Sequence, residues 1–250
     1  MKKILGLMLL LAFPVSAFCT DVQRGTASEE FIDDDFPLFD EADIIEVYDP
    51  FETINRGMFW FNDKMYFLVL KPVTRVWRYT PEPLRISLKN FFNNLQAPVR
   101  IVNAGLQGKF ATAGTELTRF ATNTTLGVAG LFDPAKEHFG QTQHNEDTGQ
   151  TFGFYGASPG PYLVLPFLGP TNVRDGIGSF GDTYLSLAWY LWGDDKSDDN
   201  FDYVGATAFD RLNRLSVDKD TYEGIKRDAL DPYLFIRDAH AQFRRNLVRN

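Results

Sequence analysis

The first twenty residues place the strongest limit on this chain, because they have the features of an export signal. Lys2 and Lys3 form a positively charged start, residues 4–13 are an apolar run, and Val15, Ser16 and Ala17 offer a small-residue cleavage site. An apolar run of about ten residues is half of the ~20 that a helix needs to cross a bilayer. We therefore expect residues 1–19 to be a cleaved signal peptide and not a membrane anchor.

Cys19, the only cysteine of the chain, has two interpretations. It stands where a bacterial lipoprotein carries its lipid, which would make residues 1–19 a lipoprotein signal. Such signals usually place a small residue directly before the cysteine, whereas the neighbour here is Phe18. The alternative is cleavage after Ala17, which leaves a free thiol near the mature N-terminus. Under either interpretation, a single cysteine excludes an internal disulfide and a zinc site built from cysteines.

The net charge of −8 is concentrated in one segment. Residues 21–48 carry ten acidic side chains against the single base Arg24, whereas residues 49–250 come to about −1. We interpret residues 20–48 as an acidic flexible linker and residues 49–250 as the folded domain. A nearly neutral domain lacks the basic face that nucleic acids require, so we expect no nucleic-acid partner.

The spacing of apolar residues predicts a mainly α fold. Residues 51–70 form a helical pattern that is aromatic on nearly all sides, which fits either a buried helix or a helix with lipid on one side and protein on the other. Residues 84–95, 98–106 and 112–125 are further predicted helices, the first with Leu84, Leu88, Phe91, Phe92 and Leu95 on one face. Residues 201–215 and 219–250 have an ordinary, charged helical pattern.

Glycine and proline punctuate the middle of the chain, where we expect tight turns and close backbone contacts. Fifteen of the 20 glycines fall between Gly105 and Gly193. Residues 162–168 are predicted to be an extended apolar segment, and residues 194–202 a polar loop. Residues 172–192 are the most apolar part of the mature chain; a helix over residues 176–192 would reach ~25 Å, short of the ~30 Å hydrocarbon core. This segment is expected to enter a membrane from one side, not to cross it.

The sequence contains no strong catalytic motif. The three histidines lack the spacing of a zinc protease helix, and no serine-hydrolase elbow occurs. His138, His144, Glu146 and Asp147 are a poor candidate metal site because polar loops often gather such residues. Gly176, Gly178 and Gly181 match a dinucleotide-binding spacing without the strand that should precede it, so close helix packing is the favoured interpretation. We expect no enzyme activity, no metal and no cofactor.

Three clusters of residues carry a specific resemblance to a known family, and they occur in the family's order and spacing. They are Asp49-Pro50-Phe51-Glu52-Thr53-Ile54-Asn55-Arg56 with Phe61-Asn62 and Lys71-Pro72-Val73; Asn90-Phe91-Phe92-Asn93-Asn94-Leu95-Gln96-Ala97-Pro98 with Asn103, Leu106-Gln107-Gly108 and Arg119-Phe120-Ala121-Thr122-Asn123-Thr124-Thr125-Leu126-Gly127; and Glu146-Asp147-Thr148-Gly149-Gln150-Thr151-Phe152-Gly153 with Gly160-Pro161-Tyr162, Pro166, Gly169-Pro170-Thr171 and Arg174-Asp175. A tail of Asp231-Pro232-Tyr233, Arg237 and Arg244 completes the pattern. From about Asp49 to Arg245 the chain resembles the MlaA (VacJ) family of outer-membrane lipoproteins. The signal departs from the family pattern at Phe18.

This resemblance implies a ring-shaped helical domain embedded in the inner leaflet of the bacterial outer membrane and facing the periplasm. Its expected substrate is phospholipid, and its expected partners are porin trimers and the periplasmic lipid carrier MlaC. The implied function is removal of mislocalised phospholipid from the outer leaflet, which maintains lipid asymmetry. Two alternatives stay open: a porin-associated scaffold that moves no lipid, and a periplasmic hydrolase that uses Glu146 and Asp147.

A lipid path needs an apolar wall for the acyl chains and polar groups for the headgroup. The aromatic helix over residues 51–70 and the segment over residues 172–192 are our candidates for the wall. The candidate path residues are Asn55, Arg56, Phe59, Phe61, Asn62, Arg174 and Asp175. The competing interpretation of the polar members of this set is helix capping and ion pairing inside the fold.

Overall fold

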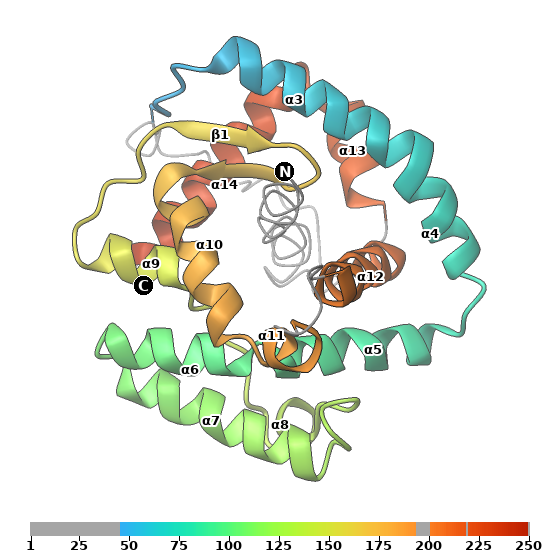
Figure 1. Ribbon diagram of the computed structural model, residues 1–250, viewed down its shortest axis with the longest axis vertical. Helices are drawn as coiled ribbons and strands as arrows, with labels where there is room; N and C mark the ends of the chain where they lie inside the picture. The colour runs from blue at the N-terminus through green and yellow to red at the C-terminus, as the bar shows by residue number, and fades with distance from the viewer. Residues whose placement is uncertain (1–45, 194–200, 219, 250) are drawn as a thin grey trace, which may run out of the picture.

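The computed structural model describes residues 46–193, 201–218 and 220–249. The signal peptide, Cys19, most of the acidic linker and residues 194–200 of the predicted polar loop lie outside these described residues. The expectation of a mainly α fold is confirmed. Figure 1 shows the elements following one another around a ring, with a short β-hairpin as part of its wall. Labels follow Figure 1.

The N-terminal half of the ring is a series of helices with short connections. They are α3 (Glu52–Met65), the π-helix η3 (Tyr66–Leu70), α4 (Lys71–Trp77), α5 (Glu82–Leu95), α6 (Ala97–Leu106), α7 (Phe110–Thr125) and α8 (Pro134–Glu137). The helices predicted over residues 84–95, 98–106 and 112–125 correspond to α5, α6 and α7, each starting one or two residues earlier. Pro83 and Pro98 lie in the first turns of α5 and α6, where a residue without N–H costs no hydrogen bond.

The helix predicted over residues 51–70 is longer than expected and continues through Pro72 to Trp77. The reason is the π-helix η3, in which the N–H of Lys71 bonds to the carbonyl of Tyr66, five residues earlier. This wider turn precedes Pro72, whose ring would otherwise clash with a regular α-helical turn. The Thr74 hydroxyl also donates to the Leu70 carbonyl at 2.6 Å.

The second half returns through a hairpin and six helices. They are α9 (Thr148–Phe154), β1 (Tyr162–Leu165), β2 (Gly169–Asn172), α10 (Val173–Leu185), α11 (Leu187–Trp192), α12 (Phe201–Val217), α13 (Thr221–Asp228) and α14 (Pro232–Arg249). The strands are antiparallel, with Tyr162 opposite Asn172 and Leu165 opposite Gly169. The predicted extended segment therefore ends at Leu165, because the chain turns where Phe167 adopts a φ of 63°.

The apolar segment over residues 172–192 does not form one helix. Ser186 is extended, with φ −74° and ψ 132°, and its hydroxyl accepts a hydrogen bond from the N–H of Ala188 as the N-cap of α11. The result is two helices with different directions, as Figure 1 shows. Within the described ranges, none of the helices combines the length and the apolar character that a membrane crossing requires.

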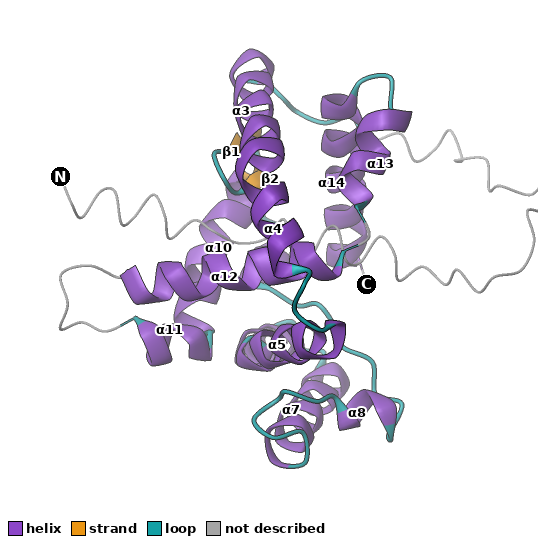
Figure 2. Cartoon of the chain, turned by 90° about the vertical axis from the view of Figure 1, so that its right-hand side faces the viewer, coloured by secondary structure: helices purple, strands orange, loops and turns teal. Residues whose placement is uncertain are grey.

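Two small apolar clusters lie in the ring wall. The first joins α5 to α11 and α12 through Phe92, Leu95, Ala188 and Tyr203. The second packs Tyr162 and Val164 of β1 against Tyr233 of α14. Figure 2 shows the perpendicular view, in which α13 and α14 lie on one side of α3 and α4, and α11 projects to the other.

Candidate functional site

The polarity of the described residues is inverted relative to an ordinary water-soluble domain. Buried positions comprise 13 hydrophobic residues against 27 polar or charged ones, whereas 30 large hydrophobic side chains are exposed. Soluble proteins normally show the reverse preference at buried positions and avoid large apolar surface patches. A protein with this distribution is suited to surroundings that are apolar on the outside.

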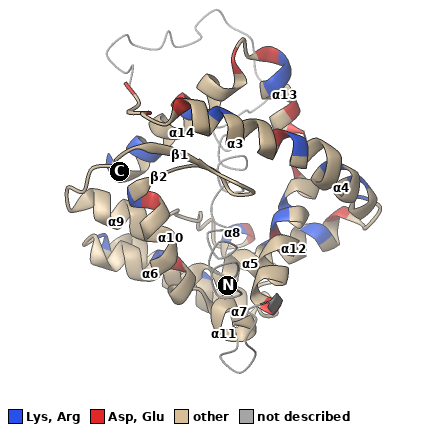
Figure 3. Cartoon of the chain, turned by 45° about the horizontal axis from the view of Figure 1, so that its top comes forward, with Lys and Arg blue, Asp and Glu red and all other residues tan. Residues whose placement is uncertain are grey.

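The helix α3–η3–α4 shows this inversion most clearly. Its exposed side carries Ile54, Trp60, Leu68 and Val76, each more than half exposed. Its other side faces α13 through ion pairs: Lys226 Nζ lies 2.5 Å from Asp63, and Lys71 Nζ lies 2.7 Å from Glu223. Figure 3 shows charged residues gathered on α13 and near α4 and α12. The helix therefore makes ion pairs with its protein neighbours while it exposes large apolar side chains.

Asn55 and Asn62, two predicted path residues, bridge α3 to the hairpin. The Asn55 amide donates to the Asp49 carboxylate at 2.8 Å and to the Tyr162 carbonyl at 3.0 Å, and its oxygen accepts from the Val164 N–H at 2.9 Å. The Asn62 amide donates to the Leu165 carbonyl at 2.8 Å and accepts from the Phe167 N–H at 2.7 Å. Both amides satisfy backbone groups of β1 or of its turn, which favours the structural interpretation. A lipid contact at either residue stays a prediction.

Arg56 and Phe59 connect α3 to α14. The Arg56 guanidinium contacts Asp231 at 2.9 Å and Glu52 at 2.8 Å, and lies 4.5 Å from the centre of the Tyr233 ring. Phe59 packs edge-on against the same ring at 5.8 Å. The Arg56 side chain is 40% exposed, so a ligand can still reach it. Of the predicted polar residues it is the one best placed to meet a headgroup.

Phe61 contacts the turn of the hairpin. Its ring packs edge-on against Phe167 at 5.2 Å. Phe167 is itself 58% exposed at the tip of the hairpin. Phe61 therefore supports an exposed aromatic tip, and its place on a lipid path stays a prediction.

Arg174 and Asp175, the remaining predicted path residues, belong to a buried ionic network at the start of α10. Arg174 Nε lies 2.8 Å from Asp175, and Arg244 of α14 bridges Asp175 at 2.7 Å and Asp147 at 2.5 Å. Burial opposes the charged carboxylates, but the Arg244 charge and hydrogen bonds outweigh it and lower the pKa of Asp147 to about 2. The pKa of Asp175 is lowered for the same reasons. Sequence reasoning placed Arg174 and Asp175 together but did not connect them to Asp147.

Asp182 is a carboxyl group that sequence reasoning missed. It accepts hydrogen bonds from the Thr148 N–H at 2.9 Å and hydroxyl at 2.6 Å, at the N-terminus of α9. Burial and the nearby charge of Asp147 raise its pKa to about 7. Its hydrogen-bond partners are neutral, unlike those of Asp147. The only hint in the sequence is a single acid within a long apolar segment.

The carboxylates proposed for a hydrolase are held by basic or amide groups. Glu146 contacts Lys109 at 2.9 Å and accepts from the Gln107 amide at 2.8 Å. Asp147 is fixed by Arg244, and its low pKa makes it a poor proton donor or acceptor near neutral pH. Among the residues that the structure describes, no three potential metal ligands come together. The arrangement gives the hydrolase alternative no support.

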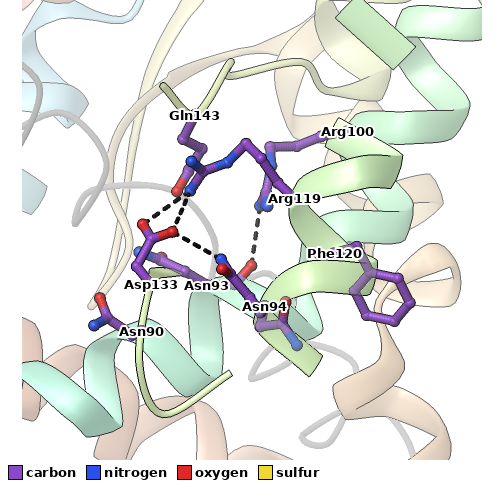
Figure 4. Close-up of a pocket in the computed structure, with 9 residues that line it drawn as sticks. Asn90, Asn93, Asn94, Arg100, Arg119, Phe120, Asp133 and Gln143 are labelled. Atoms are coloured by element: carbon purple, nitrogen blue, oxygen red, sulfur yellow. Dashed lines mark hydrogen bonds and ion pairs between the residues drawn. The ribbon is translucent and has the colours of Figure 1, made fainter. Parts of the chain in front are cut away.

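One polar cavity lies between α5, α6, α7 and α8 and is drawn in Figure 4. Arg100 pairs with the fully buried Glu116 at 2.6 Å, and Arg119 pairs with Asp133 at 2.9 Å. The cavity volume of about 10 Å³ is close to the ~10–15 Å³ that one water needs. This cavity is too small for a lipid headgroup, and its arginines are neutralised by acids of the protein.

An apolar groove between α5, α11 and α12 is much larger, with a volume of about 630 Å³. We call it the α5–α12 groove. Leu88, Phe91 and Phe92 were predicted to share one face of a helix, and they form its α5 wall. The complete lining is Leu88, Phe91, Phe92, Trp192, Asp202, Gly205, Ala206 and Phe209. The α12 residues come from more than 100 positions later in the chain, so periodicity alone did not indicate them.

Comparison with known proteins identifies the protein family to which this chain belongs. A model of the MlaA lipoprotein family matches residues 47–247. The chain belongs to the MlaA lipoprotein family. The Escherichia coli K12 intermembrane phospholipid transport system lipoprotein MlaA is 35% identical over 207 residues, covering 81% of this chain and 78% of that protein. An uncharacterized Rickettsia felis protein is 34% identical over 220 residues, covering 85% and 84%.

A solved structure of the family has the same fold. It comes from work on the structural basis for maintenance of bacterial outer membrane lipid asymmetry. Its chain superposes with a TM-score of 0.70 at 32% sequence identity, covering 80% of this chain and 98% of that one. The resemblance to the MlaA family and the mainly α fold predicted from sequence are thereby confirmed.

Proposed function

We propose that this chain transports phospholipid at the bacterial outer membrane without enzymatic chemistry. It removes mislocalised phospholipid from the outer leaflet and passes it toward the periplasm, which maintains lipid asymmetry. The proposal rests on membership of the MlaA lipoprotein family and on the inverted polarity of the described residues. The domain would sit in the inner leaflet with the ring open to the periplasm.

The inverted polarity is the observation that carries this proposal. The exposed apolar residues would face hydrocarbon, and a charged headgroup would meet polar side chains that stay reachable, such as Arg56. A scaffold docked on porins also needs an apolar exterior. Membership of the MlaA lipoprotein family, whose Escherichia coli relative is named for intermembrane phospholipid transport, favours transport over a scaffold.

The free energy of transferring a phospholipid from a membrane into water is large. A two-chain lipid with about 30 methylenes costs roughly 20–25 kcal/mol to transfer into water at about 0.8 kcal/mol per methylene. Unassisted escape is therefore very slow. A protein that keeps the acyl chains against apolar surface while the headgroup meets polar groups lowers this cost, and it needs no nucleophile to do so.

The partners implied by the family resemblance belong to the same proposal. A periplasmic lipid carrier of the MlaC type would accept the lipid, and porin trimers would hold the domain in the membrane. Among the candidate path residues, Arg56 has a side chain that is 40% exposed, and Phe61 packs against the exposed ring of Phe167.

The test is a deletion strain examined for phospholipid on the cell surface. A membrane-impermeant amine reagent labels outer-leaflet phosphatidylethanolamine, and labelling should rise in the deletion and fall again when the gene is restored. Unchanged labelling in the deletion, with altered porin assembly, would instead support the scaffold alternative.

A further inference from the structure

The α5–α12 groove has the chemistry of a hydrocarbon site. Its walls are formed by Leu88, Phe91, Phe92, Trp192 and Phe209, and the one charged residue in its lining is Asp202. Among the described residues that line the groove there is no cation to neutralise a phosphate, and Asp202 repels one. An occupant that fits this distribution of charge is uncharged where it lies in the groove.

We propose that the α5–α12 groove binds one acyl chain of the transported phospholipid. This inference rests on the proposed function, and it adds a location for part of the substrate. The headgroup lies outside the groove, away from Asp202, while the methylene chain lies against the aromatic walls.

The size of the groove fits this occupant. Its volume of about 630 Å³ lies within the ~300–1,000 Å³ typical of sites for small organic ligands. Ring contacts hold its walls in place, because the ring centre of Trp192 lies 6.0 Å from that of Phe92 and 6.5 Å from that of Phe91. Phe209 is held in turn by Trp77 at 5.3 Å. The groove is therefore built on packed rings and needs little rearrangement to accept a chain.

Gly205 keeps the groove open on the α12 side. A Cβ at this position would meet no atom within 4 Å, so the glycine is not required by helix packing. Glycine inside a helix is nevertheless unfavourable by about 1 kcal/mol relative to alanine. The space beside Gly205 can therefore be filled by substitution without a clash, which makes this position a probe of the groove.

The groove also continues onto the exterior surface. Trp192 lines it, and the preceding residues of α11, Tyr190 and Leu191, are 71% and 60% exposed. The α11 sequence, LAWYLW, contains no charged residue. A helix of this kind is suited to contact with hydrocarbon. An acyl chain can thus pass from the surrounding lipid into the groove without entering water.

Photo-crosslinking tests the location. The full chain is reconstituted in vesicles of phosphatidylethanolamine and phosphatidylglycerol that contain phosphatidylethanolamine with a diazirine at the end of one acyl chain. After irradiation, mass spectrometry should find the label on peptides of α5, α11 and α12 that contain the groove residues. Label confined to other elements would overturn the groove assignment while leaving transport intact.

Filling the groove gives a second test. Gly205→Leu places a larger side chain in the open space, and helix propensity favours leucine there. The control is Gly114→Leu, because Gly114 is also the fifth residue of its helix, α7, and a Cβ on Gly114 would likewise meet no atom within 4 Å. Groove labelling should fall about tenfold in Gly205→Leu, the change expected if two methylenes lose their burial. Equal labelling in the two variants would overturn the proposal.

The outcomes separate this inference from the proposed function. If Gly205→Leu loses groove labelling and raises surface phospholipid in cells, the transport function and the groove assignment are both supported. If cells accumulate surface phospholipid on deletion but groove labelling is absent, transport stands and the groove assignment fails.

Discussion

The backbone nitrogen of Gly149 lies 2.4 Å from the position that a Cβ on Gly178 would occupy. The helices α9 and α10 therefore approach each other as closely as two backbones can. Gly178 belongs to the spacing that matched a dinucleotide-binding pattern, and the close contact shows why glycine occurs there: it serves helix packing. The same junction holds the ionic network of Asp147, Asp175 and Arg244.

Gly178→Ala should destabilise the domain by about 1–3 kcal/mol, because the added methyl group forces α9 and α10 apart. The measurement is guanidinium unfolding of the detergent-solubilised protein. Gly57→Ala is the control, since a Cβ on Gly57 meets no atom within 4 Å, and it should be neutral or stabilising by up to about 1 kcal/mol. Equal stability of the two variants would show that α9 and α10 separate easily.

Asn55→Ala should lower the free energy of unfolding by about 1–3 kcal/mol for each backbone group left without a partner. The groups concerned are the Tyr162 carbonyl and the Val164 N–H. Thr53→Ala, at an exposed position of the same helix, should have little effect. Unchanged stability together with weaker phospholipid binding would instead assign Asn55 to the lipid path.

Arg244→Met should destabilise the domain by about 3–5 kcal/mol, because it leaves Asp147 and Asp175 as buried charges without this partner. The pKa of both carboxyls should rise, so the loss should be largest at neutral pH and shrink in acid. Arg244→Lys should restore only part of the stability, since an ammonium group cannot form the paired contacts of a guanidinium. Arg245→Ala, at the next and exposed position, is the control.

Asp182 should make the domain less stable as the pH rises from about 4 to about 7. Its pKa is raised to about 7 in the folded protein from an ordinary value near ~3.9, so folding favours the protonated form and loses this contribution as the group ionises. Asp182→Asn should remove the dependence and be more stable by about 1–3 kcal/mol at pH 8.

The contribution of Asp182 is measured as the difference in the free energy of unfolding between Asp182→Asn and the parent protein at each pH. His240 acts in the opposite direction, because burial and the neighbouring Arg244 lower its pKa to about 4 and folding then favours its neutral form. Protonation of His240 at low pH therefore destabilises the folded state. This loss occurs in Asp182→Asn and in the parent alike, so it cancels in the difference between them. A difference in unfolding free energy that does not change between pH 4 and pH 8 would contradict the assignment.

Val76→Asp should weaken membrane association, because Val76 is 67% exposed on the apolar side of α4. A charge there costs about 2.5–3.5 kcal/mol if it faces the hydrocarbon centre and almost nothing if it faces water. Flotation of the protein with vesicles measures the change. Lys136→Ala alters the net charge by the same amount at an exposed site of α8 and should float like the parent.

The sequence allowed good prediction where local pattern decides the structure. The bounds of α5 and α6 follow from apolar periodicity and from prolines in their first turns, and α7 follows Gly108; all of these are local signals. The break at Ser186 was missed because residues 176–192 contain no proline there, and a serine that caps a new helix resembles an ordinary helical serine. The continuation through Pro72 was missed because a π turn has no simple composition.

The candidate site was harder to predict because its contacts join distant parts of the chain. Asn55 was predicted as a lipid-path residue, a role that stays a prediction, and the structural partners that it has are 107 and 109 positions away. The α5 wall of the α5–α12 groove was visible as Leu88, Phe91 and Phe92 on one face. The opposite wall depends on the crossing of α5 and α12, which no single-sequence pattern specifies.

The π turn at Tyr66–Leu70 fixes the angular phase between α3 and α4. Each residue in a helix advances the side chain by about 100°, so the chain length of this turn decides which way every later side chain points. One further residue would rotate α4 by that angle, carrying Val76 off the outward side and separating the Trp77 indole from Asn213, which it contacts at 3.0 Å. This stretch should therefore tolerate exchange of one apolar residue for another far better than the insertion of a residue.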